Sequence, residues 1–267
     1  MLKQMHFKET TLHYQVKGDG PVVMLVHGFG ETADIWDRIT SQLTGYAYRC
    51  IIPDLPGSGR SGLIEDMSME GMAESLLAIL DNVKLSDCIM IGHSMGGYIT
   101  LAFAEKYESR LRGFGLFHST AYADSEEKKE TRRKGIDFIR TNGALPFLKT
   151  ATPNLYAPQS KEHHPEWIEE HIASASVLTE AALIHYYESM LVRPDRTHIL
   201  KNTKLPVLFI LGEADSAVPL SDGLQQCHIP ELSFVHVLER TGHMGMIEAA
   251  AEVNDHLVNY LSFIDQS

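Results

Sequence analysis

Residues 88–97 read Cys-Ile-Met-Ile-Gly-His-Ser-Met-Gly-Gly, and the expected fold follows from them. The run from Cys88 to Ile91 predicts a buried strand, and the residues from Ser94 to about Tyr107 predict a helix. Between them lies the pattern G-x-S-x-G, which is typical of a serine on a sharp turn from strand to helix. Glycines fit this turn because side chains two residues from the serine would clash. The stretch therefore predicts that the serine is a nucleophile, held clear of a sheet at the positive end of a helix.

Patterns typical of strands and helices alternate along most of the chain. Alternating polar and apolar residues before Gly18-Asp19-Gly20 predict a hairpin at a sheet edge. Further on, continuous apolar runs are typical of strands buried on both faces, as in parallel sheets. Such strands are predicted at residues 22–26, 48–52, 88–91, 111–117, 206–211 and 233–238, and helices at residues 32–43, 68–83, 94–107, 221–228 and 245–263. A series of this kind forms a parallel sheet covered by helices on both sides, so the predicted fold class is α/β.

Between residues 119 and 199 the alternation stops, and helices are predicted without strands. Asp124 and Glu127 are placed to form a capping box for a helix that reaches about Thr141. Two further helices are predicted at residues 166–174 and 179–192. Because this block interrupts the series between two strands, we expect an inserted helical lid in a core formed by residues 1–118 and 200–267.

His27-Gly28-Phe29-Gly30 follows the first predicted buried strand directly. A tetrahedral intermediate needs two donors aimed at its developing negative charge. We expect the backbone amides of Phe29 and Met95 to supply them, because Met95 follows the nucleophile and Phe29 lies in the loop after this strand. His27 is predicted to hold the loop by hydrogen bonds rather than to act as a catalytic base.

A serine hydroxyl needs a base, which is usually a histidine. The chain has 14 histidines, so the candidate must be selected by its position. His243 lies between the last predicted strand and the last predicted helix, at the sheet edge where the nucleophile is expected. Asp215 follows another strand at the same edge and is predicted to fix the tautomer of His243. Asp124 is its rival for this role, whereas Glu213 and Asp222 are expected to be solvated.

The resulting sequence features resemble the α/β-hydrolase superfamily, in its esterase-like branch with a lid inserted in the core. Nearly the whole chain is covered, and the matching pieces are residues 27–30, 53–61, 92–97, 212–219 and 242–243. The resemblance implies a mostly parallel, eight-stranded sheet flanked by helices, with Ser94, Asp215 and His243 as catalytic triad and with no metal or organic cofactor. Epoxide hydrolases and haloalkane dehalogenases are disfavoured, because they carry Asp where this chain has Ser94.

This resemblance implies a serine hydrolase that cleaves small to medium carboxylic esters through an acyl-enzyme intermediate. Alternatives with the same triad are carbon–carbon bond hydrolysis, acyl transfer and perhydrolysis, and a small-molecule sensor on the same fold is a further one. The expected lid holds candidate pocket residues that together predict room for an apolar acyl or alcohol group, although ordinary helix packing competes for each of them. The candidates are Phe138, Leu145, Phe147, Leu155, Tyr156, Trp167, Tyr186, Tyr187 and Met190.

Charge and cysteine content limit the partners. The chain has 23 Lys and Arg against 35 Asp and Glu, a net charge of −12, which makes nucleic acid an unfavourable partner. Its three scattered cysteines fit a reducing compartment, and no signal peptide or apolar span is evident, so we expect a cytoplasmic protein with a small-molecule ester as partner and no membrane. Residues 126–134 are mixed in sign and predict a solvated helix face, with a docking patch for an acidic carrier protein as the alternative. The oligomeric state stays open.

Overall fold

One eight-stranded sheet organises the chain, and the computed structural model describes residues 1–266 around it. The strands are β1 (Leu2–Phe7), β2 (Thr10–Lys17), β3 (Val22–Val26), β4 (Arg49–Pro53), β5 (Cys88–His93), β6 (Leu111–Phe117), β7 (Val207–Gly212) and β8 (Ser233–Leu238). They lie in the order β1-β2-β4-β3-β5-β6-β7-β8. β2 pairs antiparallel with β1 and β4, and every other neighbouring pair is parallel. The predicted α/β class with a mostly parallel sheet is confirmed.

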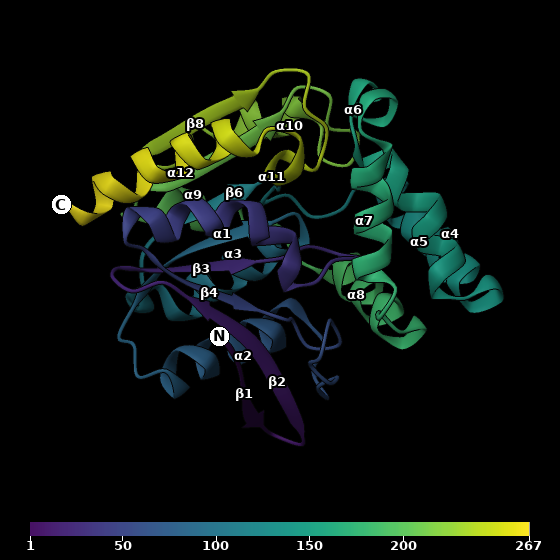
Figure 1. The fold of residues 1–267 in the computed structure, drawn as a ribbon, viewed down its shortest axis with the longest axis horizontal. Helices are drawn as coiled ribbons and strands as arrows, with labels where there is room; N and C mark the ends of the chain where they lie inside the picture. Colours follow the sequence, from purple (N-terminus) through teal and green to yellow (C-terminus); the bar gives the residue numbers. More distant parts are fainter. Residues whose placement is uncertain (267) are drawn as a thin grey trace.

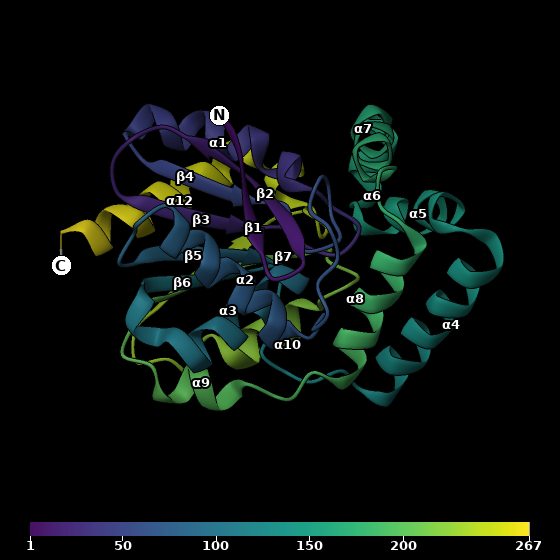
Figure 2. The same cartoon turned by 90° about the horizontal axis from the view of Figure 1, so that it is seen from below.

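Helices cover both faces of this sheet (Figures 1 and 2). One face carries α2 (Met69–Asn82), α3 (Met95–Tyr107), α9 (Thr197–Asn202) and α10 (Leu220–Gln226), and the other carries α1 (Asp37–Leu43), α11 (Gly245–Glu248) and α12 (Ala250–Asp265). Successive side chains of a strand therefore enter two different cores: Met24 packs with the first set of helices, and Val23 and Leu25 pack with the second. Burial on both sides explains why β3 reads as a continuous apolar run.

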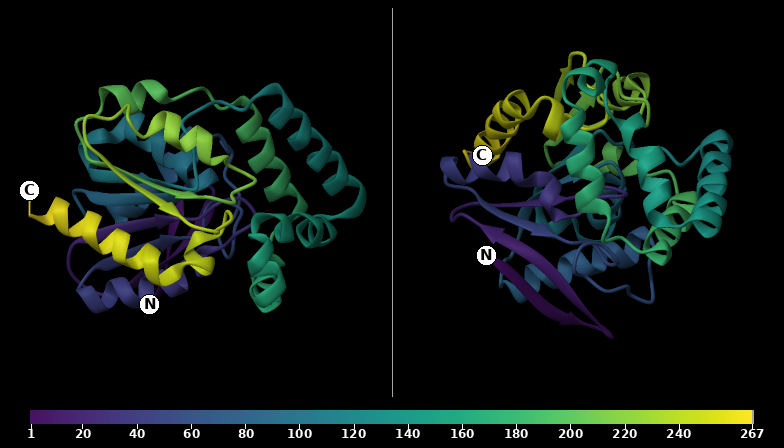
Figure 3. Two further views of the ribbon diagram at one scale, coloured as in Figure 1. Left: turned by 90° about the horizontal axis from the view of Figure 1, so that it is seen from above. Right: turned by 45° about the vertical axis from the view of Figure 1, so that its right-hand side comes forward.

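Between β6 and β7, helices replace strands, and five of them stand beyond one end of the sheet (Figures 1 and 3). These five, which we call the insertion helices, are α4 (Glu126–Asn142), α5 (Ala144–Ala151), α6 (Pro158–His163), α7 (Pro165–Ala175) and α8 (Glu180–Val192). The sequence predicted only three of them: Gly143 and Pro146 predict a break after α4, but Pro146 lies within α5, and α6 is only six residues long. Gly143 does end α4, with a φ of 93°, but α5 starts at the next residue. Single-turn 3₁₀ segments complete the connections: η1 (Ala33–Trp36), η2 (Thr44–Tyr46), η3 (Glu108–Arg110) and η4 (Thr152–Leu155).

The predicted capping box at the start of α4 is wrong. Ser125 is the N-cap, and its hydroxyl accepts a hydrogen bond of 3.2 Å from the amide of Lys128. Asp124 instead turns inward, where Arg132 and Arg193 bind its carboxylate. A buried pair of guanidinium groups outcompetes a backbone amide for this acid.

The predicted last helix is also divided. Ala249, with φ −134° and ψ 38°, separates α11 from α12. Glu248, the last residue of α11, turns toward the loop before that helix, where its carboxylate accepts hydrogen bonds from the amides of Gly242, Met244 and Ala157. Within residues 1–266, none of the helices has both the length and the apolar character needed to cross a bilayer.

Candidate active site

Ser94 sits on a strained turn between β5 and α3. Its φ of 51° and ψ of −116° lie outside the ordinary regions, and its amide donates a hydrogen bond of 2.9 Å to the carbonyl of Phe117. A Cβ on Gly92 would lie 2.2 Å from the carbonyl oxygen of Gly96, and one on Gly96 would lie 2.4 Å from that of Val26. Both glycines are therefore required by backbone contacts, which is the steric reason for the G-x-S-x-G spacing.

His243 and Asp215 form a buried hydrogen-bonded pair. Nδ1 of His243 lies 2.8 Å from Oδ2 of Asp215, while the other carboxylate oxygen accepts from the amides of Ala217 and Val218 at 2.8 and 2.9 Å. Burial lowers the pKa of His243, but the charge and hydrogen bond of Asp215 outweigh it and leave this pKa above 6.5. Because a carboxylate can only accept, Nδ1 carries the proton and Nε2 is left as the basic nitrogen.

A second histidine on the same carboxylate was not predicted. His118 follows β6 directly, and its Nδ1 lies 3.0 Å from Oδ2 of Asp215. Burial lowers the pKa of His118 to about 4, so the ring is neutral and donates from Nδ1. Two imidazole donors and two amides thus hold the carboxylate of Asp215, and its pKa, which burial would raise, is driven far below its usual value by His243 and His118. The sequence feature that could have predicted this contact is the position of His118 directly after a strand, at the sheet edge that also holds Asp215 and His243.

The three rival acids lie elsewhere. Asp124 is bound by Arg132 and Arg193. Glu213 is exposed and accepts from the amide of Arg240, and Asp222 lies 3.7 Å from Lys128. None of these three carboxylates accepts a hydrogen bond from a histidine among residues 1–266.

His27 holds the loop after β3 by hydrogen bonds, as predicted. Nε2 of this ring accepts from the amide of Leu55 at 3.0 Å, and Nδ1 donates to the carbonyl of Gly28 at 2.8 Å. Both ring nitrogens are therefore used in fixing the backbone, and burial keeps the pKa of His27 low. Among residues 1–266, no acceptor takes a hydrogen bond from the amide of Phe29 or of Met95. These two amides are thus available to a ligand.

Glu31 and His93 connect the loops around the site, and neither was predicted as a site residue. The Glu31 carboxylate accepts from the amide of Gly28 at 2.6 Å and lies 2.9 Å from Nδ1 of His93, whose Nε2 donates to the carbonyl of His243 at 2.9 Å. Each ring nitrogen of His93 thus faces an oxygen acceptor. Burial would raise the pKa of Glu31, yet the charge and hydrogen bond of His93 hold it at about 2. The loop of Gly28, the turn of Ser94 and the loop of His243 are therefore tied through one buried ion pair.

Ser94 and His243 open into a cavity of about 470 Å³. Core loops and the insertion helices both contribute to its walls. The residues that line it are Phe29, Ser94, Tyr98, Ser125, Glu127, Lys128, Thr131, Arg132, Leu155, Tyr187, Met190, Ser216, Ala217, Val218, Pro219 and His243.

Known proteins share this fold. The family model described as alpha/beta hydrolase fold matches residues 21–131. A thermophilic esterase from Thermogutta terrifontis, solved with malate bound, superposes with a TM-score of 0.90 at 29% identity over 96% of this chain and 94% of that one. The chain has the α/β-hydrolase fold.

Curated relatives of this chain differ in the activity that their names describe. The 2-hydroxy-6-oxononadienedioate/2-hydroxy-6-oxononatrienedioate hydrolase of Paraburkholderia phymatum is 27% identical over 95% of this chain and 91% of its own length. Lipase 1 of Psychrobacter immobilis is also 27% identical, over 92% of this chain and 78% of its own length. The likeness therefore extends across the core and the insertion helices but is shared by relatives with different substrates.

Only some of the predicted pocket residues line the cavity. Tyr187, Met190 and Leu155 line the cavity of Ser94. Tyr186 is buried but turns away, and its hydroxyl contacts Ser58 and donates to the carbonyl of Pro56.

The other predicted pocket residues also lie outside the cavity lining, for packing reasons. Phe147 packs edge-on against Phe29, and Tyr156 bonds to His171. Phe138 and Leu145 are 38% and 40% exposed on the outer side of α4 and α5, and Trp167 packs beneath Arg38. Helical spacing alone does not distinguish a face that meets the core from one that meets solvent.

In contrast, α4 contributes a polar wall that was not predicted. Five residues of this region line the cavity although the sequence marked residues 126–134 as a solvated face. They are Ser125, Glu127, Lys128, Thr131 and Arg132.

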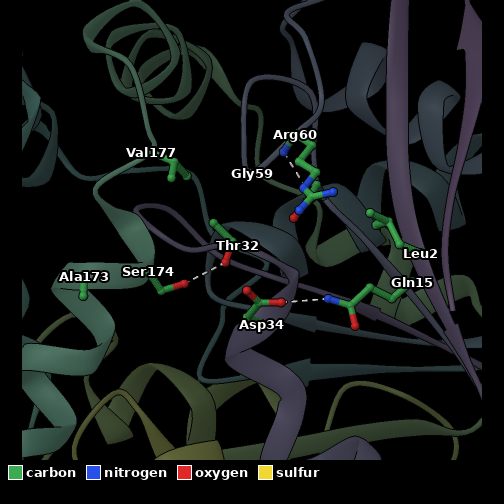
Figure 4. A pocket seen from close by; sticks show the side chains of 10 residues that line it. Leu2, Gln15, Thr32, Asp34, Gly59, Arg60, Ala173, Ser174 and Val177 are labelled. Carbon is green, nitrogen blue, oxygen red and sulfur yellow. Dashed lines mark hydrogen bonds between the residues drawn. The ribbon is translucent and has the colours of Figure 1, made fainter.

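The insertion helices also hold the loop of Phe29. The ring of Phe29 stacks on Tyr187 of α8 at 4.2 Å, and Nε2 of His171 in α7 donates to the carbonyl of Gly30 at 3.3 Å. The hydroxyls of Thr32 and Ser174 meet at 2.9 Å, as Figure 4 shows. Three separate contacts thus tie the expected oxyanion loop to α7 and α8.

A second hollow, of about 460 Å³, is lined by Thr32 and by the other residues drawn in Figure 4. It lies between the β1–β2 hairpin, the loop of Arg60 and α7. Both carboxylates that line it already accept hydrogen bonds: Asp34 accepts from Gln15 at 2.7 Å, and Asp54 accepts from the amides of Ala33 and Arg60. The described residues that line this hollow include no histidine, whereas Ser94 and His243 both line the other cavity.

The cluster of His118, Asp215 and His243 has the residue types of a metal site, with ligand atoms within 4.8 Å of one another. In this α/β hydrolase, however, the two Nδ1 atoms already converge as donors on one carboxylate oxygen. The donor set fits proton transfer through His243.

Proposed function

We propose that this α/β hydrolase is a serine hydrolase that cleaves small to medium carboxylic esters through an acyl-enzyme intermediate. One observation carries the proposal: Ser94, on a strained turn, opens into the same cavity as His243, whose Nδ1 is bonded to the buried carboxylate of Asp215. This combination is the arrangement of an activated nucleophile. The ester-cleaving relatives support the same reading.

In the first step, the hydroxyl oxygen of Ser94 attacks the ester carbonyl and gives its proton to Nε2 of His243. Asp215 keeps the other proton on Nδ1 and stabilises the imidazolium that forms. The carbonyl oxygen becomes an oxyanion, and the free amides of Phe29 and Met95 are assigned to receive it. The alcohol then leaves with the proton from His243, which gives an acyl-enzyme on Ser94.

In the second step, water replaces the alcohol. His243 takes a proton from the water as it attacks the acyl carbonyl, and then returns it to the oxygen of Ser94 as the carboxylic acid departs. The products are one alcohol and one acid, and each proton taken by His243 is given back. The residues of the chain account for this balance.

Residues 119–199 are proposed as a lid over this chemistry, inserted in a core of residues 1–118 and 200–267. Support comes from the lining, since α4 and α8 both contribute side chains to the cavity of Ser94. Covering the site would exclude water and shape the pocket.

Fluorophosphonate labelling combined with an ester panel tests the proposal. Wild type should be labelled once and should hydrolyse p-nitrophenyl esters of short and medium chain, whereas Ser94→Ala should be neither labelled nor active. Ser233→Ala, in an edge strand away from the cavity, is the matched control and should behave as wild type. Equal labelling of Ser94→Ala, or no ester turnover by labelled wild type, would contradict the ester-hydrolase proposal.

Carbon–carbon bond hydrolysis is the second candidate, and its support is the 27% identity with the dioate hydrolase named above. It would use the same serine and histidine on a vinylogous diketone carbonyl. Turnover of such a diketone with a kcat/KM well above that of every ester in the panel would favour it over the first candidate.

A further inference from the structure

One wall of the catalytic cavity is basic and comes from a single helix. Lys128 and Arg132 lie four residues apart on the same face of α4, and Ser125 and Thr131 add hydroxyls beside them. The facing wall is apolar, with side chains such as Tyr187 and Met190. A cavity that bound only apolar esters would not need a basic wall, because a cation near apolar surface costs free energy unless it is paired.

Arg132 shares its acid with a second guanidinium group. The Asp124 carboxylate is bonded to Nε and Nη2 of Arg132 and lies 2.8 Å from Nη1 of Arg193. One carboxylate between two guanidinium groups leaves one positive charge uncompensated. Arg193 is enclosed, with a side chain 3% exposed that donates to the carbonyls of Met190 and Tyr122. The surplus charge therefore reaches the cavity through Arg132.

The guanidinium of Arg132 is fixed, with one nitrogen to spare. Asp124 holds its Nε and Nη2, and the ring of Tyr187 lies with its centroid 5.6 Å from the guanidinium carbon. Its Nη1 bonds to no acceptor among residues 1–266, and the side chain is 17% exposed. A preorganised guanidinium with a free edge is a good receptor for a carboxylate.

Two other charged groups of α4 face the same space. Lys128 is paired loosely, at 3.7 Å, with Asp222, which is not part of the lining. Glu127 is exposed and has no cation partner in the described part of the chain. Apart from the proposed catalytic groups, the lining thus contains two cations and one exposed anion, and the cation nearest to complete burial is Arg132.

We propose that the cavity selects esters that carry a carboxylate, and that Arg132 binds this carboxylate through its free edge while Ser94 attacks the ester carbonyl. The proposal rests on the proposed ester hydrolysis and names its substrate class: half-esters of dicarboxylic acids, or esters of hydroxy acids. Lys128 lies one turn away and adds a second positive charge for the same group. Tyr187 and Met190 enclose the chain between the two polar ends.

Two matched substrate pairs test it, one for each end of the ester. The first pair is the p-nitrophenyl half-ester of glutaric acid against p-nitrophenyl pentanoate. The second pair is the butyrate ester of 4-hydroxybenzoic acid against that of its methyl ester. In at least one pair, wild type should favour the carboxylate member in kcat/KM by about ten- to hundredfold, the gain typical of a charge-assisted hydrogen bond.

Variants at position 132 separate charge from shape. Arg132→Gln should reduce this preference to about one, and Arg132→Lys should keep part of it, because the ammonium keeps the charge but not the fork. Arg133→Gln is the matched control: its side chain is 53% exposed and, among residues 1–266, forms an ion pair only with Glu130 on the same helix, so the preference should be unchanged. Asp124 keeps Arg193 as partner in each variant, which favours correct folding.

Calorimetric titration with glutarate and with neutral glutaramide distinguishes the two proposals, since binding needs no turnover. Wild type should bind glutarate at least tenfold more tightly than glutaramide, and Arg132→Gln should lose this difference. Ester turnover without any carboxylate preference, or a preference that survives in Arg132→Gln, overturns the subsite. Glutarate binding that depends on Arg132 without turnover of any ester supports the subsite as a carboxylate site and contradicts only the ester hydrolysis.

Discussion

The floor and the roof of the catalytic cavity are built by different means. By the floor we mean the loops at the end of the sheet, residues 27–31, 92–95, 212–218 and 240–245, and by the roof the insertion helices α4–α8. Floor groups are held by several hydrogen bonds each, as Asp215 is by two amides and two imidazoles. Roof groups that line the cavity are held mainly by ring packing, as Tyr187 is on Phe29, and by ion pairs such as that of Arg132 with Asp124. On the proposed function, the floor would determine the reaction type and the roof the choice of substrate.

The largest expected effect is on the floor. Asp215→Asn keeps the volume of the side chain but removes the charge that supports the imidazolium of His243, and it favours the wrong tautomer. We expect kcat to fall by about 10⁴-fold, with KM changed little. Asp222→Asn, on an acid outside the cavity lining, should retain wild-type kcat. Ester kinetics on both proteins decide the matter, and a fall of less than tenfold in Asp215→Asn would mean that another acid orients the base.

Loss of the buried ion pair under the floor should come next. Glu31→Gln leaves an acceptor for the amide of Gly28 but removes the charge opposite His93. Without this charge the three loops are held together less firmly, so kcat should fall by about tenfold or more. This loss is smaller than the loss expected when an oxyanion donor is removed completely. The pKa of His243 should also fall, because the charge of Glu31 raises it.

The control for this change is Glu170→Gln, whose carboxylate is 72% exposed and lies 3.8 Å from Arg38. It should leave both kcat and the pH profile as in wild type. Breaking a buried pair costs about 3 kcal/mol of the free energy of unfolding, so assays belong well below the melting temperature. A Glu31→Gln protein with lower stability but unchanged kcat and pH profile would show that the pair is only structural.

Sequence patterns are most informative where the backbone dictates the residue. The turn at Ser94 was predictable because it tolerates only glycine at positions 92 and 96, and the meeting of Asp215 with His243 was predictable because both follow strands at one edge. Glu31 and His93 escaped notice because a single acid and a single histidine make no motif until folding joins positions 62 residues apart.

In the roof, apolar residues at helical spacing could face the core, solvent or a cavity equally well. Tyr187 and Phe138 were predicted on the same grounds, yet only Tyr187 lines the cavity. The cavity face of α4 was missed for the related reason that its charged residues match the pattern of a solvated helix. Which side of a helix meets a cavity depends on long-range packing that no local pattern encodes.

Low pH should lower kcat/KM through protonation of His243, a floor residue, without any change to the insertion helices. His243 must be neutral to act as base, and its pKa lies above 6.5 because Asp215 outweighs burial. As pH falls below that pKa, the ring is increasingly protonated, so kcat/KM should fall about tenfold for each further pH unit. A pH series with a neutral ester measures this limb. A constant kcat/KM between pH 7 and pH 5 would exclude His243 as the base.

The smallest expected effects lie in the roof and separate two residues that the sequence could not. Met190→Ala enlarges the cavity lining, so it should raise the kcat/KM of longer acyl chains relative to short ones by about three- to tenfold, since one or two extra methylenes can then be buried. Phe138→Ala removes a ring of similar hydrophobicity that is 38% exposed on the outer side of α4, and it should leave the chain-length profile within about twofold of wild type. The ratio of kcat/KM for p-nitrophenyl octanoate and butyrate measures both. If Phe138→Ala shifted this ratio as much as Met190→Ala, selectivity would come from the stability of the insertion helices rather than from the shape of the cavity, and the division between floor and roof would lose its meaning.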